Sequence, residues 1–307
     1  APGRCKYGLM LDENGMVMDD GVVACITDHQ FVLTTTTGGA ARVYAWLERW
    51  HQTEWPELKI WISSVTDQLA AIAVAGPKSR ELLRSLGSDI DFEGDAFPFM
   101  SWRDGHLDSM PVRLWRVSFS GELAYEIHFD SAYALSLWQA LYDAGQAWNI
   151  TPYGTETMHV LRAEKGFIIV GQDTDGSVTP ADLGMNWAVG KNKPFPFVGQ
   201  RSLTRSDTAR TDRRQLVGLM PTNPNARIAE GAQITENEPV NKPATMLGHV
   251  TSSYFSSVLG HHIALALVTC GRDRIGSKLV ATARGQQLTV EVVPPTFLDP
   301  QGERQHV

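Results

Sequence analysis

The first part of the chain alternates between strand-like and helix-like hydrophobic patterns. An apolar stretch at 7–11 is followed by Asn14-Gly15, and a second apolar stretch covers 16–24. Asn-Gly between two such stretches is typical of a turn that joins antiparallel strands. A third apolar stretch starts at 31–33. The pattern therefore predicts three antiparallel strands.

Helical spacing of apolar residues appears first at 39–50. The remaining elements expected before residue 200 are strands at 58–65 and 69–74 and two within 111–129, and helices at 76–86, 131–148 and 155–165. The helix at 131–148 is expected to bury the face formed by Leu135, Trp138, Leu141 and Tyr142. Strands that alternate with single helices in this way favour an α+β fold over a parallel doubly wound sheet.

The last third of the chain has a different pattern. Short strands separated by Gly, Pro and Asn are expected at 215–220, 232–234, 247–252, 263–268, 278–283 and 288–293. Such close spacing is typical of a small β-sandwich or β-barrel. A charged connector at 201–214 precedes it, so we expect one domain at 1–210 and another at 211–307.

Composition narrows the function classes. The 307 residues carry a net charge of -7 and are 43% hydrophobic, which indicates a globular protein without a nucleic-acid surface. No apolar run approaches the roughly 20 residues that span a bilayer, so we expect no membrane contact. Cys5, Cys25 and Cys270 are far apart, which favours a reducing, cytoplasmic setting over a disulfide framework or zinc site.

Two acidic positions interrupt apolar strands. Successive residues of a strand face opposite sides, so Asp19 and Asp20 lie on opposite, otherwise apolar faces. At least one carboxylate is expected to be half-buried, either as a ligand site or as a cap on a turn. Glu126 lies between Tyr125 and Ile127, where it is either a second ligand-binding acid or a salt-bridged edge residue.

Other common sites lack their sequence signals. No Gly-x-Gly-x-x-Gly follows a strand, and no phosphate loop of the Walker kind is present. The histidines lack partners at metal-ligand spacing. We therefore expect neither a dinucleotide site nor a metal site in this chain.

Several motifs together resemble the glycine-cleavage T-protein family. They are Tyr-Gly-Leu-Met-Leu at 7–11 with Asn-Gly at 14–15, Met-Asp-Asp at 18–20, Ser-Gly-Glu at 120–122, Tyr-Glu-Ile at 125–127, Leu-Arg-Ala-Glu-Lys-Gly at 161–166 and Gly-His-Val-Thr-Ser at 248–252. The resemblance covers nearly the whole chain in order. It implies two intertwined α+β domains around a central folate pocket, followed by a C-terminal β-barrel.

Within that family, the sequence at 18–22, 34–39 and 295–305 most resembles the aminomethyltransferase-like part of the α subunits of heterotetrameric sarcosine oxidases. The chain begins without Met and without the first stretch of the family fold, so an N-terminal truncation is expected. The flavin-bearing subunits of such an oxidase are the implied partners. FAD, FMN and NAD are expected only in parts of the complex outside this chain.

The resemblance implies an activity. A flavin site oxidises an N-methyl amine to an iminium, and tetrahydrofolate bound to this module captures the one-carbon unit as 5,10-methylenetetrahydrofolate. The module belongs to an oxidoreductase acting on CH–NH donors and is expected to be inactive in oxidation without its flavin-bearing partner. The alternative is a non-catalytic folate-binding or docking scaffold.

The resemblance also implies site residues. Asp20 corresponds to the family's catalytic carboxylate near the reactive folate nitrogens, and Glu126 to the acid that binds the amide-bearing pterin edge. The remaining residues expected in the pocket are Tyr7, Thr34, Thr36 and Phe119. Two positions depart from the family pattern: Phe119 replaces a common Tyr, and Met158 replaces an Arg near the folate tail.

Overall fold

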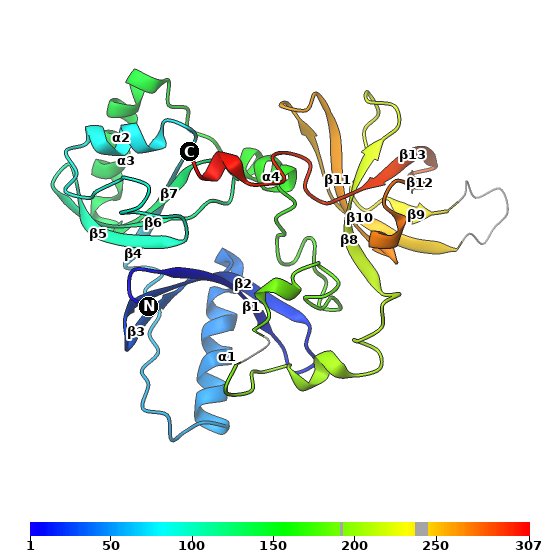
Figure 1. Cartoon of the computed structure of the whole chain (residues 1–307), viewed down its shortest axis with the longest axis horizontal. Helices are drawn as coiled ribbons and strands as arrows, with labels where there is room; N and C mark the ends of the chain where they lie inside the picture. The colour runs from blue at the N-terminus through cyan, green and yellow to red at the C-terminus, as the bar shows by residue number, and fades with distance from the viewer. Residues whose placement is uncertain (191–192, 237–244) are drawn as a thin grey trace. The chain divides into compact units, whose positions relative to one another are not determined.

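The computed structural model describes residues 1–190, 193–236 and 245–307 (Figure 1). These form two compact units, each with its own core. Unit 1 comprises residues 1–8, 19–153 and 302–307, and unit 2 comprises residues 9–18 and 154–301. The division of the chain at residue 210 stays a prediction.

A three-stranded sheet begins the chain. Its order is β1 (Cys5–Leu11), β2 (Val17–Thr27) and β3 (Gln30–Leu33), and β2 pairs antiparallel with β3. The three strands predicted from the apolar alternation are thus present. The Asn-Gly turn closes as expected, because the Gly15 amide donates to the Asp12 carbonyl at 3.0 Å.

Unit 1 also contains a four-stranded antiparallel sheet in the order β4-β7-β6-β5. Its strands are β4 (Leu69–Ala75), β5 (Ser101–Leu107), β6 (Met110–Arg116) and β7 (Ala124–Asp130). The pattern did not predict β5, whose Asp and Gly disfavour strands. Pairing with β6 supports it, since Asp104 lies opposite Arg113 and accepts two hydrogen bonds from it.

The strand predicted at 58–65 is wrong. The segment follows α1 (Ala40–Thr53) and pairs with no described strand. Instead, helix side chains contact its backbone: His51 Nε2 lies 2.9 Å from the Leu58 carbonyl oxygen, and the Tyr44 hydroxyl donates to Ile62 at 3.5 Å. Contacts with the preceding helix therefore replace the expected ladder.

Helices α2 (Ser79–Ser85) and α3 (Ala134–Gly145) cover one face of the four-stranded sheet (Figure 1). The predicted buried face of α3 is wrong except at Leu141. Leu135 and Trp138 are 78% and 46% exposed, whereas Leu137 and Leu141 are buried. The reason is the helical phase: Leu137 and Leu141 are four residues apart and meet the sheet together, which turns Leu135 and Trp138 outward.

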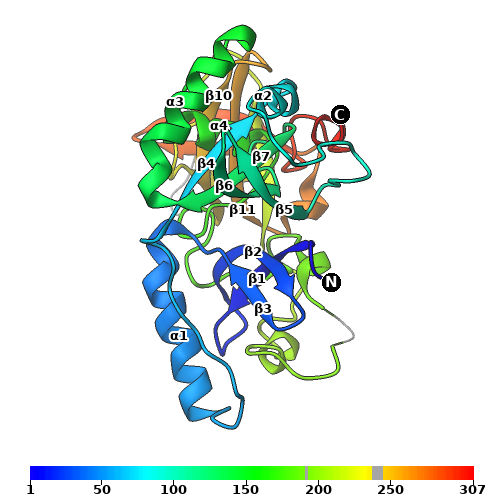
Figure 2. The ribbon, with the colours of Figure 1, turned by 90° about the vertical axis from the view of Figure 1, so that its left-hand side faces the viewer.

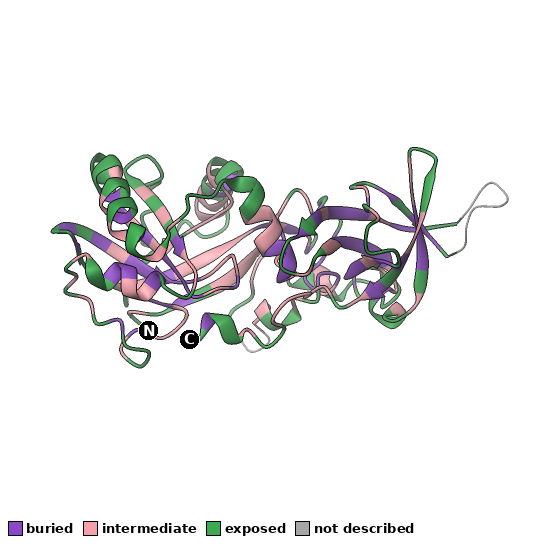
Figure 3. Ribbon diagram, turned by 90° about the horizontal axis from the view of Figure 1, so that it is seen from above, coloured by how far each residue is buried: buried purple, intermediate pink, exposed green. Residues whose placement is uncertain are grey.

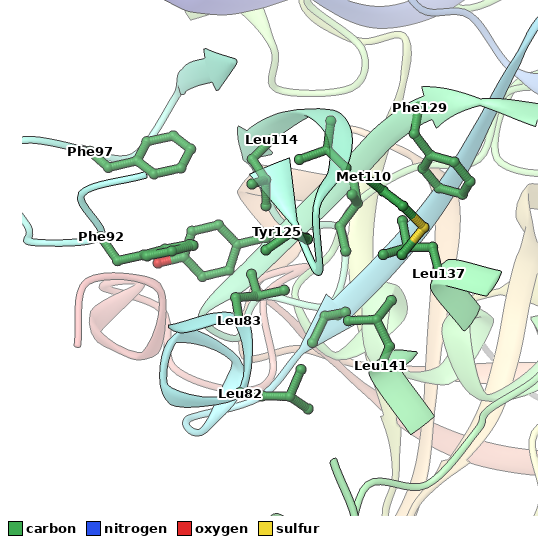
Figure 4. Packing of buried hydrophobic residues seen from close by; sticks show 14 of the residues in the cluster. Leu82, Leu83, Phe92, Phe97, Met110, Leu114, Tyr125, Phe129, Leu137 and Leu141 are labelled. Carbon is green, nitrogen blue, oxygen red and sulfur yellow. The ribbon is translucent and has the colours of Figure 1, made fainter. Parts of the chain in front are cut away.

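The core under α2 and α3 is aromatic at one end. Figure 4 shows Tyr125 pointing toward Phe92 and Phe97, with ring centroids 5.6 to 6.3 Å apart. The opposite face of the sheet packs on β1–β3 through Trp102 and Trp115. Unit 1 is therefore layered as helices, four-stranded sheet and three-stranded sheet, with α1 beyond (Figures 1 and 2). The four-stranded and three-stranded sheets thus face each other.

Unit 2 contains a closed barrel in the order β10-β11-β8-β13-β12-β9. Its described strands are β8 (Arg214–Pro221), β9 (Gln233–Thr235), β10 (Met246–Ser256), β11 (His261–Thr269), β12 (Lys278–Ala283) and β13 (Gln286–Val293). All six predicted strands are confirmed, and barrel is the correct choice between the two expected architectures. Buried residues follow the barrel strands in Figure 3.

The last long helix, α4 (Thr155–Glu164), packs on β10 and β11. Short 3-10 helices cover Thr37–Gly39, Ser131–Tyr133, Gln146–Trp148, Asn186–Ala188, Arg201–Thr204, Gly271–Arg274 and Glu303–Gln305. Among the residues placed by the structure, no helix combines the length and apolar character needed to cross a membrane.

A buried ion pair fastens α4 to the barrel. Arg162 Nη1 donates to Asp173 at 2.5 Å, and both side chains are fully buried. The other Asp173 oxygen accepts from Thr251 and Ser252 at 2.5 and 2.6 Å, and Ser252 also accepts from Arg162 at 2.7 Å. These hydrogen bonds offset part of the cost of burying the pair, although the Arg162 Nε atom has no hydrogen-bond partner among the described residues.

Asp173→Ala should therefore destabilise unit 2 by about 3–5 kcal/mol, because it leaves the Arg162 charge buried without its counter-ion. Urea unfolding measures this. The matched control is Asp212→Ala, which breaks the exposed Arg210–Asp212 pair of similar geometry and should leave the midpoint near that of the wild type. Equal effects of the two substitutions would contradict the prediction.

Candidate functional site

The two acids of β2 have different surroundings. Asp19 is fully buried on the face toward 34–39 and α1. Its oxygens accept from the Thr36 amide and hydroxyl, both at 3.0 Å, and from the Asp20 amide at 2.9 Å. Arg42 of α1 lies 3.5 Å away. Asp19 therefore caps the turn before α1, which is one of the two roles that the sequence left open.

Glycines let the backbone approach Asp19 closely. A Cβ atom on Gly39 would lie 1.8 Å from the Asp19 Oδ2 atom, and one on Gly21 would lie 1.9 Å from the Thr34 carbonyl oxygen. Neither distance is possible between two atoms that are not bonded to each other. The segment 34–39 can therefore lie against β2 only because both positions lack side chains.

Asp20 lies on the other face of β2 and is half-buried. Its Oδ2 atom accepts a hydrogen bond from the Tyr7 hydroxyl at 2.7 Å. Burial raises the pKa of Asp20, the Tyr7 hydrogen bond opposes that rise, and the Asp19 charge adds to it. Burial and the Asp20 charge likewise raise the pKa of Tyr7. The structure thus brings together two of the predicted site residues.

Glu126 lies on the face of the four-stranded sheet that packs on the three-stranded sheet, opposite Trp115 in the register. Burial raises the pKa of the Cys5 thiol to about 12, and the Glu126 charge contributes to that rise although Arg4 opposes it. Cys5 is two residues before Tyr7 on β1, so the two side chains share a face. Burial, and then Glu126, raise the pKa of Tyr153. The two acids therefore lie on two sheets that face each other.

The predicted pocket residues Thr34 and Thr36 make hydrogen bonds within unit 1. The Thr34 hydroxyl accepts from the Val22 amide at 2.9 Å and lies 3.2 Å from the Val22 carbonyl oxygen, while Thr36 donates to Asp19. Thr34 and Thr36 thus stabilise the segment after β3. Phe119 is half-buried in the turn between β6 and β7.

Two neighbours of Glu126 were missed from the sequence. His128 Nε2 lies 3.5 Å from Glu126 Oε2, and Trp115 lies opposite Glu126 in the β6–β7 register. Both also line a groove of about 430 Å³, a size that suits a small molecule. The strand period offered a signal, because residues 126 and 128 share a face, but pairing with Trp115 depends on the register of β6.

Gly39→Ala should displace the Asp19 carboxylate and destabilise unit 1 by about 1–3 kcal/mol, because the added Cβ atom would overlap the hydrogen-bonded side chains of Asp19 and Thr36. Thermal unfolding measures the loss. Gly38→Ala is the matched control, since a Cβ atom there meets nothing within 4 Å. If the two variants melt together, the close approach at Gly39 does not constrain the fold.

Asp20→Asn should change how stability depends on pH. Since burial raises the pKa of Asp20 in the folded state, the folded protein retains a proton that the unfolded chain releases above about pH 4. This contribution is fully present below the unfolded pKa and is lost as pH rises through the folded pKa. The variant should therefore gain stability relative to the wild type between pH 4 and pH 7.

Urea unfolding at several pH values between 4 and 7 tests this expectation. Asp28→Asn, in the exposed turn between β2 and β3, controls for the loss of one negative charge. A difference between Asp20→Asn and the wild type that stays constant with pH would show that burial does not perturb Asp20.

Family models match both parts of the chain. The GCVT N-terminal domain matches residues 1–193, and the glycine cleavage T-protein C-terminal barrel domain matches residues 214–299. The crystal structure of glycine cleavage system aminomethyltransferase T from Bartonella henselae superposes with a TM-score of 0.81 at 23% identity, over 97% of this chain and 77% of that one. The predicted T-protein-like α+β fold with a C-terminal barrel is confirmed.

Sequence relatives are of two kinds. Sarcosine oxidase subunit alpha of Corynebacterium sp. (strain P-1) is 52% identical over 98% of this chain, and that of Rhizobium meliloti is 40% identical over 99%. The chain spans 31% of the length of each. An aminomethyltransferase of Thermotoga neapolitana is 30% identical over 96% of this chain and 76% of its own length. This chain belongs to the glycine-cleavage T-protein family and is similar to the T-protein-like part of sarcosine oxidase α subunits.

Proposed function

We propose that unit 1 binds tetrahydrofolate between its two sheets and transfers a one-carbon unit to it. The observation that carries this proposal is the pair of acids, Asp20 and Glu126, on two sheets that face each other. Family membership supports the folate, since relatives include aminomethyltransferases. The one-carbon unit exchanges its amine nitrogen for two folate nitrogens, which gives 5,10-methylenetetrahydrofolate, and the amine leaves with the two protons that those nitrogens release.

The two acids have separate tasks. Glu126 accepts hydrogen bonds from N–H groups of the amide-bearing pterin edge, which suits a carboxylate that is 35% exposed. Asp20 stabilises the positive charge that develops when a folate nitrogen attacks an iminium carbon. Its raised pKa suits transient proton binding, and the Tyr7 hydroxyl fixes the orientation of the carboxylate.

The one-carbon unit must come from elsewhere. Relatives named as sarcosine oxidase α subunits are about three times as long as this chain. We propose that a flavin-bearing part of the same complex oxidises an N-methyl amine and supplies the iminium, with FAD, FMN and NAD bound there. The three cysteines are free thiols, which suits a reducing compartment such as the cytoplasm.

Calorimetric titration with 5-formyltetrahydrofolate tests the binding. Glu126→Gln should weaken it about 10- to 100-fold, because a charge-assisted hydrogen bond contributes about 1.5–3 kcal/mol. Glu57→Gln, in the exposed segment after α1, is the control for charge. No binding heat from a wild-type chain with native circular dichroism would exclude the proposed folate site.

The rate of product formation distinguishes a catalytic module from a non-catalytic scaffold that only binds folate. In the complete oxidase complex, Asp20→Asn should leave folate affinity within a few fold but reduce formation of 5,10-methylenetetrahydrofolate about 10²- to 10⁴-fold. Unchanged product formation would favour the scaffold, in which the iminium is captured without help from this chain.

A further inference from the structure

His128 has a fixed position next to Glu126. The two residues are separated by one position on β7, so their side chains leave the same face of the sheet. His128 Nε2 lies 3.5 Å from Glu126 Oε2. The His128 side chain is only 13% exposed, whereas that of Glu126 is 35% exposed. The more buried member of the pair is therefore the imidazole.

Trp115 holds the imidazole ring. The two rings lie 4.5 Å apart between centroids, at 32° to each other. Trp115 is fully buried and lies opposite Glu126 in the β6–β7 register. Because the indole packs against the imidazole, packing rather than a hydrogen bond determines where His128 lies.

The nearby guanidinium of Arg113 is engaged elsewhere. Arg113 lies opposite His128 in the register, but it donates two hydrogen bonds to Asp104, at 2.7 and 2.8 Å. It also stacks over the Trp102 ring at 4.7 Å. Both contacts draw the guanidinium toward β5. The group at ion-pair distance from Glu126 is thus His128.

The Nε2 atom of His128 is buried and has no hydrogen-bond partner among the described residues. At 3.5 Å, the Glu126 oxygen is too distant for a good hydrogen bond, and a shift of a few tenths of an ångström would form one. Catalytic and ligand-binding hydrogen bonds often have this length before the ligand arrives and tighten in the complex. The buried nitrogen therefore points to a contact completed on binding.

We propose that His128 is a positioning residue, which donates from Nε2 to Glu126 and holds the carboxylate toward a ligand edge that carries N–H groups. The proposal rests on the proposed function, in which Glu126 binds the pterin edge of folate. His128 takes one side of Oε2, which leaves Oε1 and the other Oε2 lone pair for two adjacent ligand donors. The ligand class is therefore a ring that presents neighbouring amide and amino N–H groups.

Two substitutions distinguish the role of the Nε2 atom from the role of the imidazole ring. His128→Phe keeps a ring against Trp115 but removes Nε2, and His128→Gln keeps a donor nitrogen at similar reach without the ring. Calorimetry with 5-formyltetrahydrofolate should show that the Phe variant binds about tenfold more weakly and the Gln variant within about threefold of the wild type. A purely structural role of the ring would give the opposite order.

A double-mutant cycle with Glu126→Gln tests whether His128 acts through the carboxylate. His128→Phe should have little further effect on affinity once Glu126 is replaced, and melting temperatures identify any variant that fails to fold. Wild-type-like binding by His128→Phe, or an undiminished effect in the Glu126→Gln background, overturns the role of His128. Loss of binding in Glu126→Gln would still support the folate site, whereas a wild type that does not bind overturns both proposals.

Discussion

The geometry of the site depends on the hydrogen bonds by which the Asp19 carboxylate caps the turn before α1. The carboxylate binds both the amide and the hydroxyl of Thr36, and it does so at a distance that only a glycine at position 39 allows. This fixes the segment after β3 on one face of β2. Because neighbouring strand residues point in opposite directions, the same arrangement directs Asp20 to the other face, toward Tyr7. A fully buried, hydrogen-bonded acid thus positions a half-buried one.

Buried charged groups have different surroundings in the two units. In unit 2, Arg162 and Asp173 are both fully buried, and Asp173 accepts further hydrogen bonds from Thr251 and Ser252. Such a network holds an interface between helix and barrel without needing a ligand. In unit 1, Asp20 has a raised pKa and His128 has a buried nitrogen without a partner in the described residues. Groups left in this state lower stability, and they gather where a ligand would contact them.

The sequence predicted much of this fold because its local signals were strong. The barrel strands alternate regularly between turns, and each was found from its own residues. Tertiary contacts decided the rest. The segment at 58–65 has a strand pattern, but His51 and Tyr44 contact its backbone where a ladder would form. The face of α3 depended on a rotation that separates Leu137 from Leu135, which apolar counts alone could not distinguish because both residues are leucine.

At the site, the period-2 alternation of the strand predicted that Asp19 and Asp20 lie on opposite faces. It did not predict which of them would cap the turn and which would contact Tyr7. That choice required Thr36 and Gly39, which are 17 and 20 positions away from Asp19 in the chain. Predicting the role of His128 would have required the contacts of two further strands. The imidazole packs on Trp115 from β6, and Arg113 is held by Asp104 from β5. Residues that contact a ligand can be recognised from a motif, whereas residues that orient them depend on register. Positioning residues are therefore the part of a site that a structure adds to its sequence.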